Sequence, residues 1–312
     1  MRGLGALALA ATLLAGCATP VASPRPVPSP APLPGMPPAP TAPASPESAA
    51  ARAYYGQVQQ ALLSQGLLRT DGGGADTPYT DRMLAEIFLQ IALYDEYVPG
   101  TGGMMASGKA STLRRWTGPV RVGLRFGASV PADVRATDTA RVASYLARLA
   151  RVTGHPIRLD DANPNFFVHI VSEDERRNLG PALQAALPGL GAADVAGITQ
   201  MPQSTYCAVL AQSRGQGGIY TRAFAVVRAE HPDLLRLSCL HEEIAQGLGL
   251  PNDSPRARPS IFNDDEEFAL LTGMDEAMLR ILYNPALRPG MTETEARPIV
   301  FDLAARMLGG AS

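Results

Sequence analysis

The sequence has little that would suit it to bind nucleic acid or to cross a membrane more than once. Its 312 residues carry 27 Lys and Arg against 29 Asp and Glu, a formal net charge of −2. A chain this close to neutral offers no broad basic surface for a nucleic-acid partner. No apolar run reaches the roughly 20 residues that a membrane-spanning helix requires. We therefore expect no nucleic-acid partner and no transmembrane helix.

The first residues have the composition of an export signal. Arg2 precedes an apolar run over residues 4–15, which is shorter than the roughly 20 residues needed to span a bilayer. The run ends in Leu-Ala-Gly-Cys17, which resembles the bacterial lipobox. That resemblance implies cleavage of residues 1–16 and a lipid on Cys17. An ordinary signal peptide with an incidental cysteine is the alternative.

A lipid on Cys17 would make the membrane a partner of the mature chain. Ala18 follows the cysteine in place of Asp, which implies the outer rather than the inner membrane. Residues 17–47 alternate Pro with Ala, Val and Ser, and such a segment favours polyproline II over a packed core. It could hold a folded part up to about 80 Å from the membrane. We expect a lipid-anchored cell-envelope protein that faces the periplasm.

Cysteine is scarce, with three in the chain. Lipidation of Cys17 leaves Cys207 and Cys239, an even number in an oxidising compartment, which predicts a disulfide between them. Two buried thiols are the alternative. The spacing is not Cys-x-x-Cys, so a redox-active pair is not indicated.

Hydrophobic periodicity divides the rest of the chain into an N-terminal helical region, 48–112, and a larger domain, 113–312. Helices are predicted at 48–66 and 80–97, followed by a Gly-rich loop at 100–109 that lacks the phosphate-binding motif. The domain alternates predicted strands and helices. The strands are 120–126, 157–161, 166–172, 205–212 and 219–230, and the helices are 139–152, 177–187 and 232–250. We predict an α+β fold with a mixed, partly parallel twisted sheet packed against long helices.

The segment from residue 239 to 253 carries most of the chemical information. A His-Glu-x-x-His zinc helix that started at His241 would need its second histidine at position 245, which is Ala245. Shifted by one residue, the segment resembles the zinc helix of the metzincin metalloproteases, with its Gly249 turn. The resemblance assigns the three ligand positions to Glu242, Gln246 and Asn252, and the general-base position to Glu243. All three histidine ligands are therefore replaced.

Other segments carry the same resemblance. Ser260, Ile261 and Phe262 look like the turn beneath the metal, with Phe262 at the methionine position. The chain over 114–300 also resembles the DUF2927 family of bacterial lipoproteins, through Arg-Trp at 115–116, the Asn-Asp pair and Leu-Tyr-Asn-Pro at 282–285. The resemblance implies a zincin-like fold and assigns no activity.

A carboxylate and two amides make a poor zinc site. Oxygen donors suit Ca²⁺, Mg²⁺ or Mn²⁺ better than Zn²⁺. They would not lower the pKa of a bound water to about 7, as catalytic zinc sites do. We expect no cofactor beyond a weakly held divalent cation, and zinc is not expected.

Three functions remain open. The domain is a non-catalytic scaffold that binds a peptide or an envelope protein, a metallopeptidase-like hydrolase that uses Glu243 as its base, or a purely structural lipoprotein. A hydrolase would need a third group beside Glu242 and Glu243, and Asp253, Asp264 and His169 are candidates. His169 lies mid-strand, where a buried, hydrogen-bonded histidine is expected. A solvated helix face is the alternative for Gln246.

Overall fold

Strands with alternating apolar residues form one mixed sheet. The computed structural model describes residues 44–100, 103–215, 217–263 and 265–309, with the backbone alone over most of 96–107. The sheet order is β3-β8-β6-β4-β5, all parallel, and β7 pairs antiparallel with β8. The strands are β3 Arg115–Trp116, β4 Val120–Phe126, β5 Ile157–Leu159, β6 Phe166–Val171, β7 Cys207–Ser213 and β8 Ile219–Arg228. The predicted α+β fold is confirmed.

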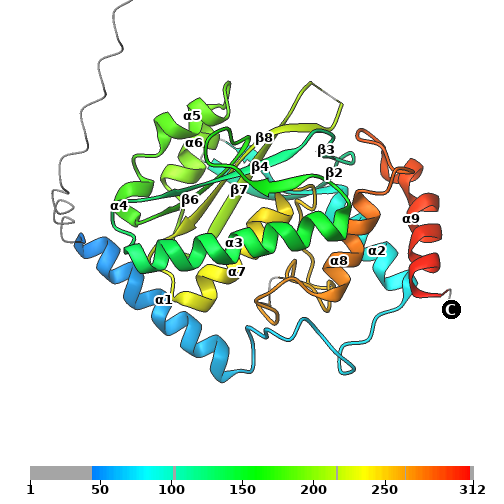
Figure 1. The fold of residues 1–312 in the computed structure, drawn as a ribbon, viewed down its shortest axis with the longest axis horizontal. Helices are drawn as coiled ribbons and strands as arrows, with labels where there is room; N and C mark the ends of the chain where they lie inside the picture. Colours follow the sequence, from blue (N-terminus) through cyan, green and yellow to red (C-terminus); the bar gives the residue numbers. More distant parts are fainter. Residues whose placement is uncertain (1–43, 101–102, 216, 264, 310–312) are drawn as a thin grey trace, which may run out of the picture. The chain divides into compact units, whose positions relative to one another are not determined.

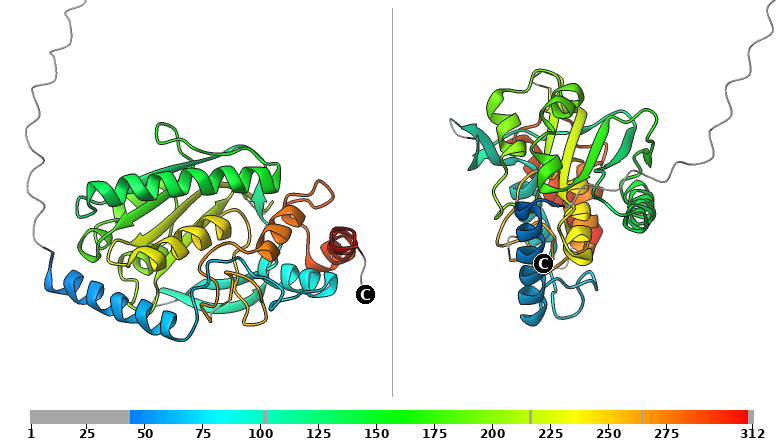
Figure 2. Two further views of the ribbon diagram at one scale, coloured as in Figure 1. Left: turned by 60° about the horizontal axis from the view of Figure 1, so that its bottom comes forward. Right: turned by 90° about the vertical axis from the view of Figure 1, so that its left-hand side faces the viewer.

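Helices cover both faces of this sheet (Figures 1 and 2). α3 Ala132–Thr153 and α7 Asp233–Gln246 pack on one face, where their apolar residues join the main core with alternate residues of β6, such as Val168. α5 Gly180–Ala186 and α6 Ala192–Thr199 pack on the other face in a smaller core. The parallel strands are thus buried on both faces, as parallel sheets usually are.

The remaining helices complete the folded unit. α2 Asp81–Ala92, α8 Gly273–Leu282 and α9 Glu293–Leu308 contribute apolar residues to the main core. α4 Glu173–Arg176 is one turn that follows β6. Thr272 and Thr292 cap α8 and α9 through reciprocal bonds with Asp275 and Glu295. No helix in the described part of the chain is long and apolar enough to cross a bilayer.

The N-terminal region differs from the prediction in one respect. α1 Pro46–Ser64 and α2 agree with the predicted helices, but α2 ends at Ala92 and the chain continues as a strand. β1 Tyr94–Gly100 and β2 Gly103–Ala110 pair antiparallel, so the segment predicted to be a Gly-rich loop is a hairpin. Glycine has a low strand propensity, but the backbone hydrogen bonds between β1 and β2 outweigh it in this segment. Both predicted regions lie in one compact unit, Thr41–Ser312.

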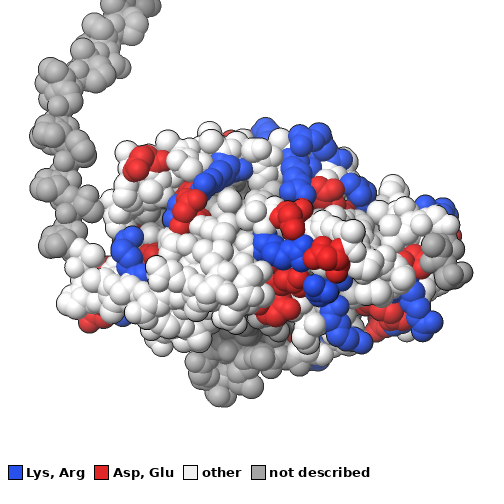
Figure 3. Space-filling view, turned by 90° about the horizontal axis from the view of Figure 1, so that it is seen from below, with Lys and Arg blue, Asp and Glu red and all other residues white. Residues whose placement is uncertain are grey.

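α1 is fastened to the sheet domain by polar contacts. The Ser45 amide donates to the Asp174 carboxylate at 3.1 Å, and the Ser48 hydroxyl donates to the Glu230 carboxylate at 2.6 Å. The Tyr55 hydroxyl donates to the Gln203 carbonyl at 2.8 Å. Few charges lie on α1 itself, and Figure 3 shows a largely uncharged surface at its left, where α1 runs, beside a band in which both signs alternate.

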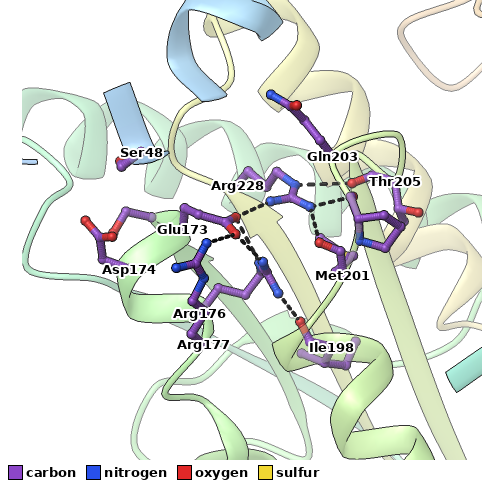
Figure 4. Close-up of polar contacts among 12 residues, drawn as sticks. Ser48, Glu173, Asp174, Arg176, Arg177, Ile198, Met201, Gln203, Thr205 and Arg228 are labelled. Atoms are coloured by element: carbon purple, nitrogen blue, oxygen red, sulfur yellow. Dashed lines mark hydrogen bonds and ion pairs between the residues drawn. The ribbon is translucent and has the colours of Figure 1, made fainter. Parts of the chain in front are cut away.

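Beneath α1, three arginines meet one carboxylate (Figure 4). Glu173 accepts from Arg176 at 2.6 Å, from Arg228 at 2.5 Å and from the more exposed Arg177 at 3.2 Å. Arg228 also donates to the carbonyls of Met201, Pro202 and Thr205. This cluster ties α4 and the loop after α6 to the end of β8.

Candidate active site

The helix that carries the predicted site is buried along its second half. Every residue from Ser238 to Leu250 is buried except Glu242, which is partly exposed. Glu243 is 4% exposed and Gln246 is 6% exposed. The alternative of a solvated helix face for Gln246 is therefore wrong. Its amide is buried beside apolar neighbours, where a polar group needs a hydrogen-bond partner.

Two glycines determine how the chain leaves α7. At Gly247 a Cβ would lie 2.4 Å from the Phe166 ring, so the helix end packs directly on β6. Gly249 has a φ of +127°, and a Cβ there would lie 2.2 Å from the carbonyl oxygen of Arg114. A side chain is excluded at both positions by space, and at Gly249 by conformation as well.

The three predicted ligand positions do not share one set of contacts. Gln246 Nε2 donates to Asp253 Oδ1 at 3.2 Å. Asn252 Nδ2 donates to the carbonyl of Gln90 at 2.9 Å, and its backbone amide donates to the carbonyl of Ile91 at 3.2 Å. Asn252 thus fastens the segment after α7 to α2. The structure links Gln246 with Asp253, and directs the Asn252 amide to another element.

Glu242 and Glu243 lie beside a sulfur atom. One carboxylate oxygen of each and Cys207 Sγ are all within 4.8 Å of one another. Adjacent helical residues point about 100° apart, so the sequence did not predict this approach. A signal existed nevertheless: Cys239 precedes the glutamates by three and four residues, on the same helical face. Any partner of Cys239 must therefore lie near them.

The predicted disulfide is confirmed. Cys207 on β7 and Cys239 on α7 are bonded, with their Cα atoms 5.9 Å apart. The bond ties the edge strand to the helix. It also keeps Cys207 from acting as a thiolate ligand, so the oxidised chain offers carboxylate oxygens alone at this corner.

The turn after the site is held by a buried carboxylate. Asp275 accepts hydrogen bonds from the Ser260 hydroxyl at 2.5 Å, the Ile261 amide at 3.1 Å and the Thr272 amide at 2.8 Å. Burial raises the pKa of Asp275, although these donors oppose the shift. Phe262 is fully buried in the main core. The turn is thus part of the packed interior.

The family model described as protein of unknown function (DUF2927) matches residues 81–302. The chain belongs to the DUF2927 family. No curated protein and no solved structure was found to match it.

The DUF2927 hallmark residues have a structural role around Gly249. The Trp116 indole donates to the carbonyl of Gly247, and the Tyr283 hydroxyl donates to the carbonyl of Leu248, each at 2.9 Å. Arg115 donates to the carbonyls of Leu282, Asn284 and Leu287. The Arg-Trp pair and the Leu-Tyr-Asn-Pro segment therefore hold the chain where it leaves α7.

His169, the histidine expected as a third group, does not lie beside the two glutamates of this DUF2927 protein. His169 lies on the sheet face opposite α7, half-buried and stacked on Phe224, with ring centroids 4.4 Å apart. It therefore cannot serve as the third group beside Glu243. Burial, with a smaller effect of Arg125, lowers its pKa to about 4. Its expected hydrogen bond is absent among the described residues.

His241 is a core residue. Its Nδ1 accepts from the Leu271 amide at 3.1 Å, and its ring stacks on Tyr145 at 3.9 Å. Burial lowers its pKa to about 3. Asp264, the other candidate third group, lies outside the described residues.

Proposed function

We propose that this protein is a lipid-anchored lipoprotein of the cell envelope, whose zincin-like domain holds no catalytic zinc and serves as a binding or scaffold protein facing the periplasm. The outer membrane is the preferred location. A peptide or an envelope protein is the proposed partner.

One observation carries the non-catalytic part of the proposal. The two amides at ligand positions are engaged elsewhere, Gln246 with Asp253 and Asn252 with the carbonyl of Gln90. A catalytic zinc site needs three protein ligands directed at one point and an open position for water. Here each amide forms a hydrogen bond within the fold instead, Gln246 to a residue seven positions on and Asn252 to α2. Polar groups at this corner act as a hydrogen-bond network.

The order of elements supports the zincin-like resemblance. A mixed sheet and the 22-residue helix α3 precede α7, as the resemblance implies. The chain leaves α7 through Gly249, whose positive φ fits the expected glycine turn. The turn at Ser260, Ile261 and Phe262 is buried, and the Phe262 carbonyl accepts from the Ser254 amide at 3.0 Å, in the segment that follows α7.

The cysteine pattern supports the proposed compartment. Lipidation of Cys17 leaves two cysteines, and these two form the disulfide of the folded unit. Disulfides of this kind persist in oxidising compartments such as the bacterial periplasm.

The edge strand β7 supports an extended peptide as the bound group. Among the described strands β7 pairs with β8 alone, and it carries Cys207 next to Glu242 and Glu243. An edge strand offers backbone donors and acceptors that can pair with an added peptide strand. Side chains of that peptide would meet the two carboxylates at one end, which favours a basic residue there.

A hydrolase is the second candidate. The close approach of one carboxylate oxygen from each of Glu242 and Glu243 favours it, since paired carboxylates in different environments can divide acid and base roles. Glu243 is buried and Glu242 is partly exposed.

Peptide cleavage separates the two candidates. The purified protein and its Glu243→Gln variant are incubated with a mixed peptide library, with and without added Mn²⁺ or Zn²⁺, and the products are read by mass spectrometry. We expect no cleavage that depends on Glu243. Cleavage that disappears in Glu243→Gln but not in the matched Glu276→Gln variant would make the protein a hydrolase.

Lipid anchoring needs its own test. Cells that express the chain are labelled with radioactive palmitate, and the Cys17→Ser variant is the control. We expect label in the native chain alone, together with its loss from the membrane fraction in the variant. Equal labelling of both, or none in either, would contradict the anchor.

A further inference from the structure

A hollow lies at the opposite end of β8 from Cys207. It has a volume of about 440 Å³ and is lined where β3, β4, β6 and β8 begin, by Trp116, Arg121, Asn165, Arg214, Ile219 and Thr221. Cys207 pairs with Val227, seven residues along β8 from Tyr220. At roughly 3.3 Å per residue the two places are about 23 Å apart along the strand. Its size is in the range of small-molecule sites.

The walls of this strand-start hollow are fixed by hydrogen bonds. Asn165 Oδ1 accepts from the Arg121 backbone amide at 2.7 Å, and Asn165 Nδ2 donates to the carbonyl of Pro119 at 2.9 Å. Nearby, Gly218 approaches the Leu113 carbonyl so closely that a Cβ would lie 2.5 Å from its oxygen. Hydrogen bonds and close packing thus hold together three segments that are distant in sequence, around residues 119–121, 165 and 218.

Two arginines line the strand-start hollow without a carboxylate partner. Arg121 Nε donates to the carbonyl of Asn163 at 2.6 Å, which orients its guanidinium and leaves both terminal nitrogens available. Within the described residues neither Arg121 nor Arg214 forms an ion pair, and the Arg214 side chain makes no hydrogen bond. The lining contains no acidic residue. Its formal charge is therefore positive.

An apolar surface lies next to these charges. Ile219 is 37% exposed, and few other large apolar side chains of the described residues are exposed. Trp116 and Tyr220 form the adjoining wall. A ligand that matches this lining has one anionic end and one apolar end.

We propose that the strand-start hollow binds a small organic anion, with its carboxylate or phosphate group held by Arg121 and Arg214 and its apolar part against Ile219. Guanidinium groups bind both anions through charge-assisted hydrogen bonds, and a fixed guanidinium loses less freedom when it binds. This site is independent of the proposed binding at Glu242 and Glu243.

Binding of three simple probes tests the proposal. N-acetyl-leucine supplies a carboxylate, phenyl phosphate supplies a phosphate, and N-acetyl-leucinamide is the neutral match of the first. Calorimetric titration of the full chain at constant ionic strength is expected to give saturable one-site binding of at least one anion and none of the amide. The anion that binds more tightly shows whether the hollow prefers a carboxylate or a phosphate group.

Variants locate the binding. Arg214→Gln is expected to weaken binding of the anion at least tenfold, because it removes a charge-assisted hydrogen bond, which is stronger than a neutral one. Arg121→Gln should do the same. Arg52→Gln removes an exposed, unpaired arginine of α1 and should leave affinity unchanged.

Three results would overturn the proposal: no saturable binding of either anion, equal binding of the amide, or an unchanged affinity in Arg214→Gln. Because Arg214 is exposed and its side chain forms no hydrogen bond or ion pair within the described residues, its variant should fold even if Arg121→Gln does not. Circular dichroism of each variant verifies this.

Discussion

Replacement of Glu173 by glutamine should destabilise the protein strongly. The side chains of Arg176 and Arg228 are 2% and 1% exposed, and Glu173 is their shared carboxylate. Removal of one partner from a buried ion pair costs about 3–5 kcal/mol, because the remaining charge is left without compensation. Arg177 adds little, since its side chain is 52% exposed. Arg228 keeps three carbonyl acceptors, so we expect about 3 kcal/mol, at the lower end of that range.

The assay is equilibrium unfolding in urea, with thermal unfolding as a second readout. A loss of about 3 kcal/mol corresponds to a fall in melting temperature of about 6–12 °C for a domain of this size. Asp302→Asn is the matched control, because Asp302 pairs with Arg306 on an exposed surface, and it should change stability by less than about 0.5 kcal/mol.

The same substitution should alter the response to acid. Burial acts to raise the pKa of Glu173, but its hydrogen bond with Arg176 and the charges of Arg176 and Arg228 outweigh burial, so the pKa is lowered. The ionised form thus stabilises the folded state above pH of about 4.5, and this contribution is lost as pH falls through the lowered pKa. Glu173→Gln should lack this part of the acid response. Equal stability of the variant and the native chain at pH 7 would refute the role of the cluster.

Three further predictions concern the fold around the site. Gly249→Ala should cost at least about 2 kcal/mol in urea unfolding, because of strain at positive φ and the clash with the Arg114 carbonyl; a change below about 0.5 kcal/mol, the size of a surface-substitution effect, would contradict this. Alkylation before non-reducing mass measurement should leave Cys207 and Cys239 unlabelled, and full labelling would contradict the disulfide. Loss of this disulfide, which joins residues 32 positions apart, should lower the free energy of unfolding by about 3–4 kcal/mol. Stability should fall by about 1.4 kcal/mol per pH unit below pH of about 6.5 through His241, because this histidine is buried and stays neutral when folded; equal stability at pH 7 and pH 5 would argue against its burial.

Much of the fold could be predicted because its signals are local. Alternating apolar residues predicted a strand at 120–126, and β4 has the same bounds. The helical period of apolar residues predicted α7, with an end a few residues later than the structure has it. The disulfide followed from cysteine number and the expected oxidising compartment. The hairpin of β1 and β2 could not be predicted, because its glycines favour a loop and only pairing between the two strands stabilises it.

The candidate site could be predicted less well, because its contacts join distant segments. The metzincin resemblance pointed to Gln246 and Asn252 as ligand positions, but the partner of Asn252 is Gln90, 162 positions away. No sequence pattern indicates that bond. His169 was a plausible partner for Glu243 until the topology put it on the other face of the sheet. The period of two along a strand places alternate residues on opposite faces of the sheet. Which of the two faces packs against α7 depends on the tertiary arrangement of the helices, which the strand pattern does not reveal.

Metal content is the most direct test of a zincin-like domain without zinc. The protein is purified without chelator, and its zinc is measured by elemental analysis per chain, before and after dialysis against a chelator. We expect less than one zinc per chain, with no change in unfolding on chelator treatment. One zinc per chain, removed by the chelator together with a peptidase activity, would contradict the account.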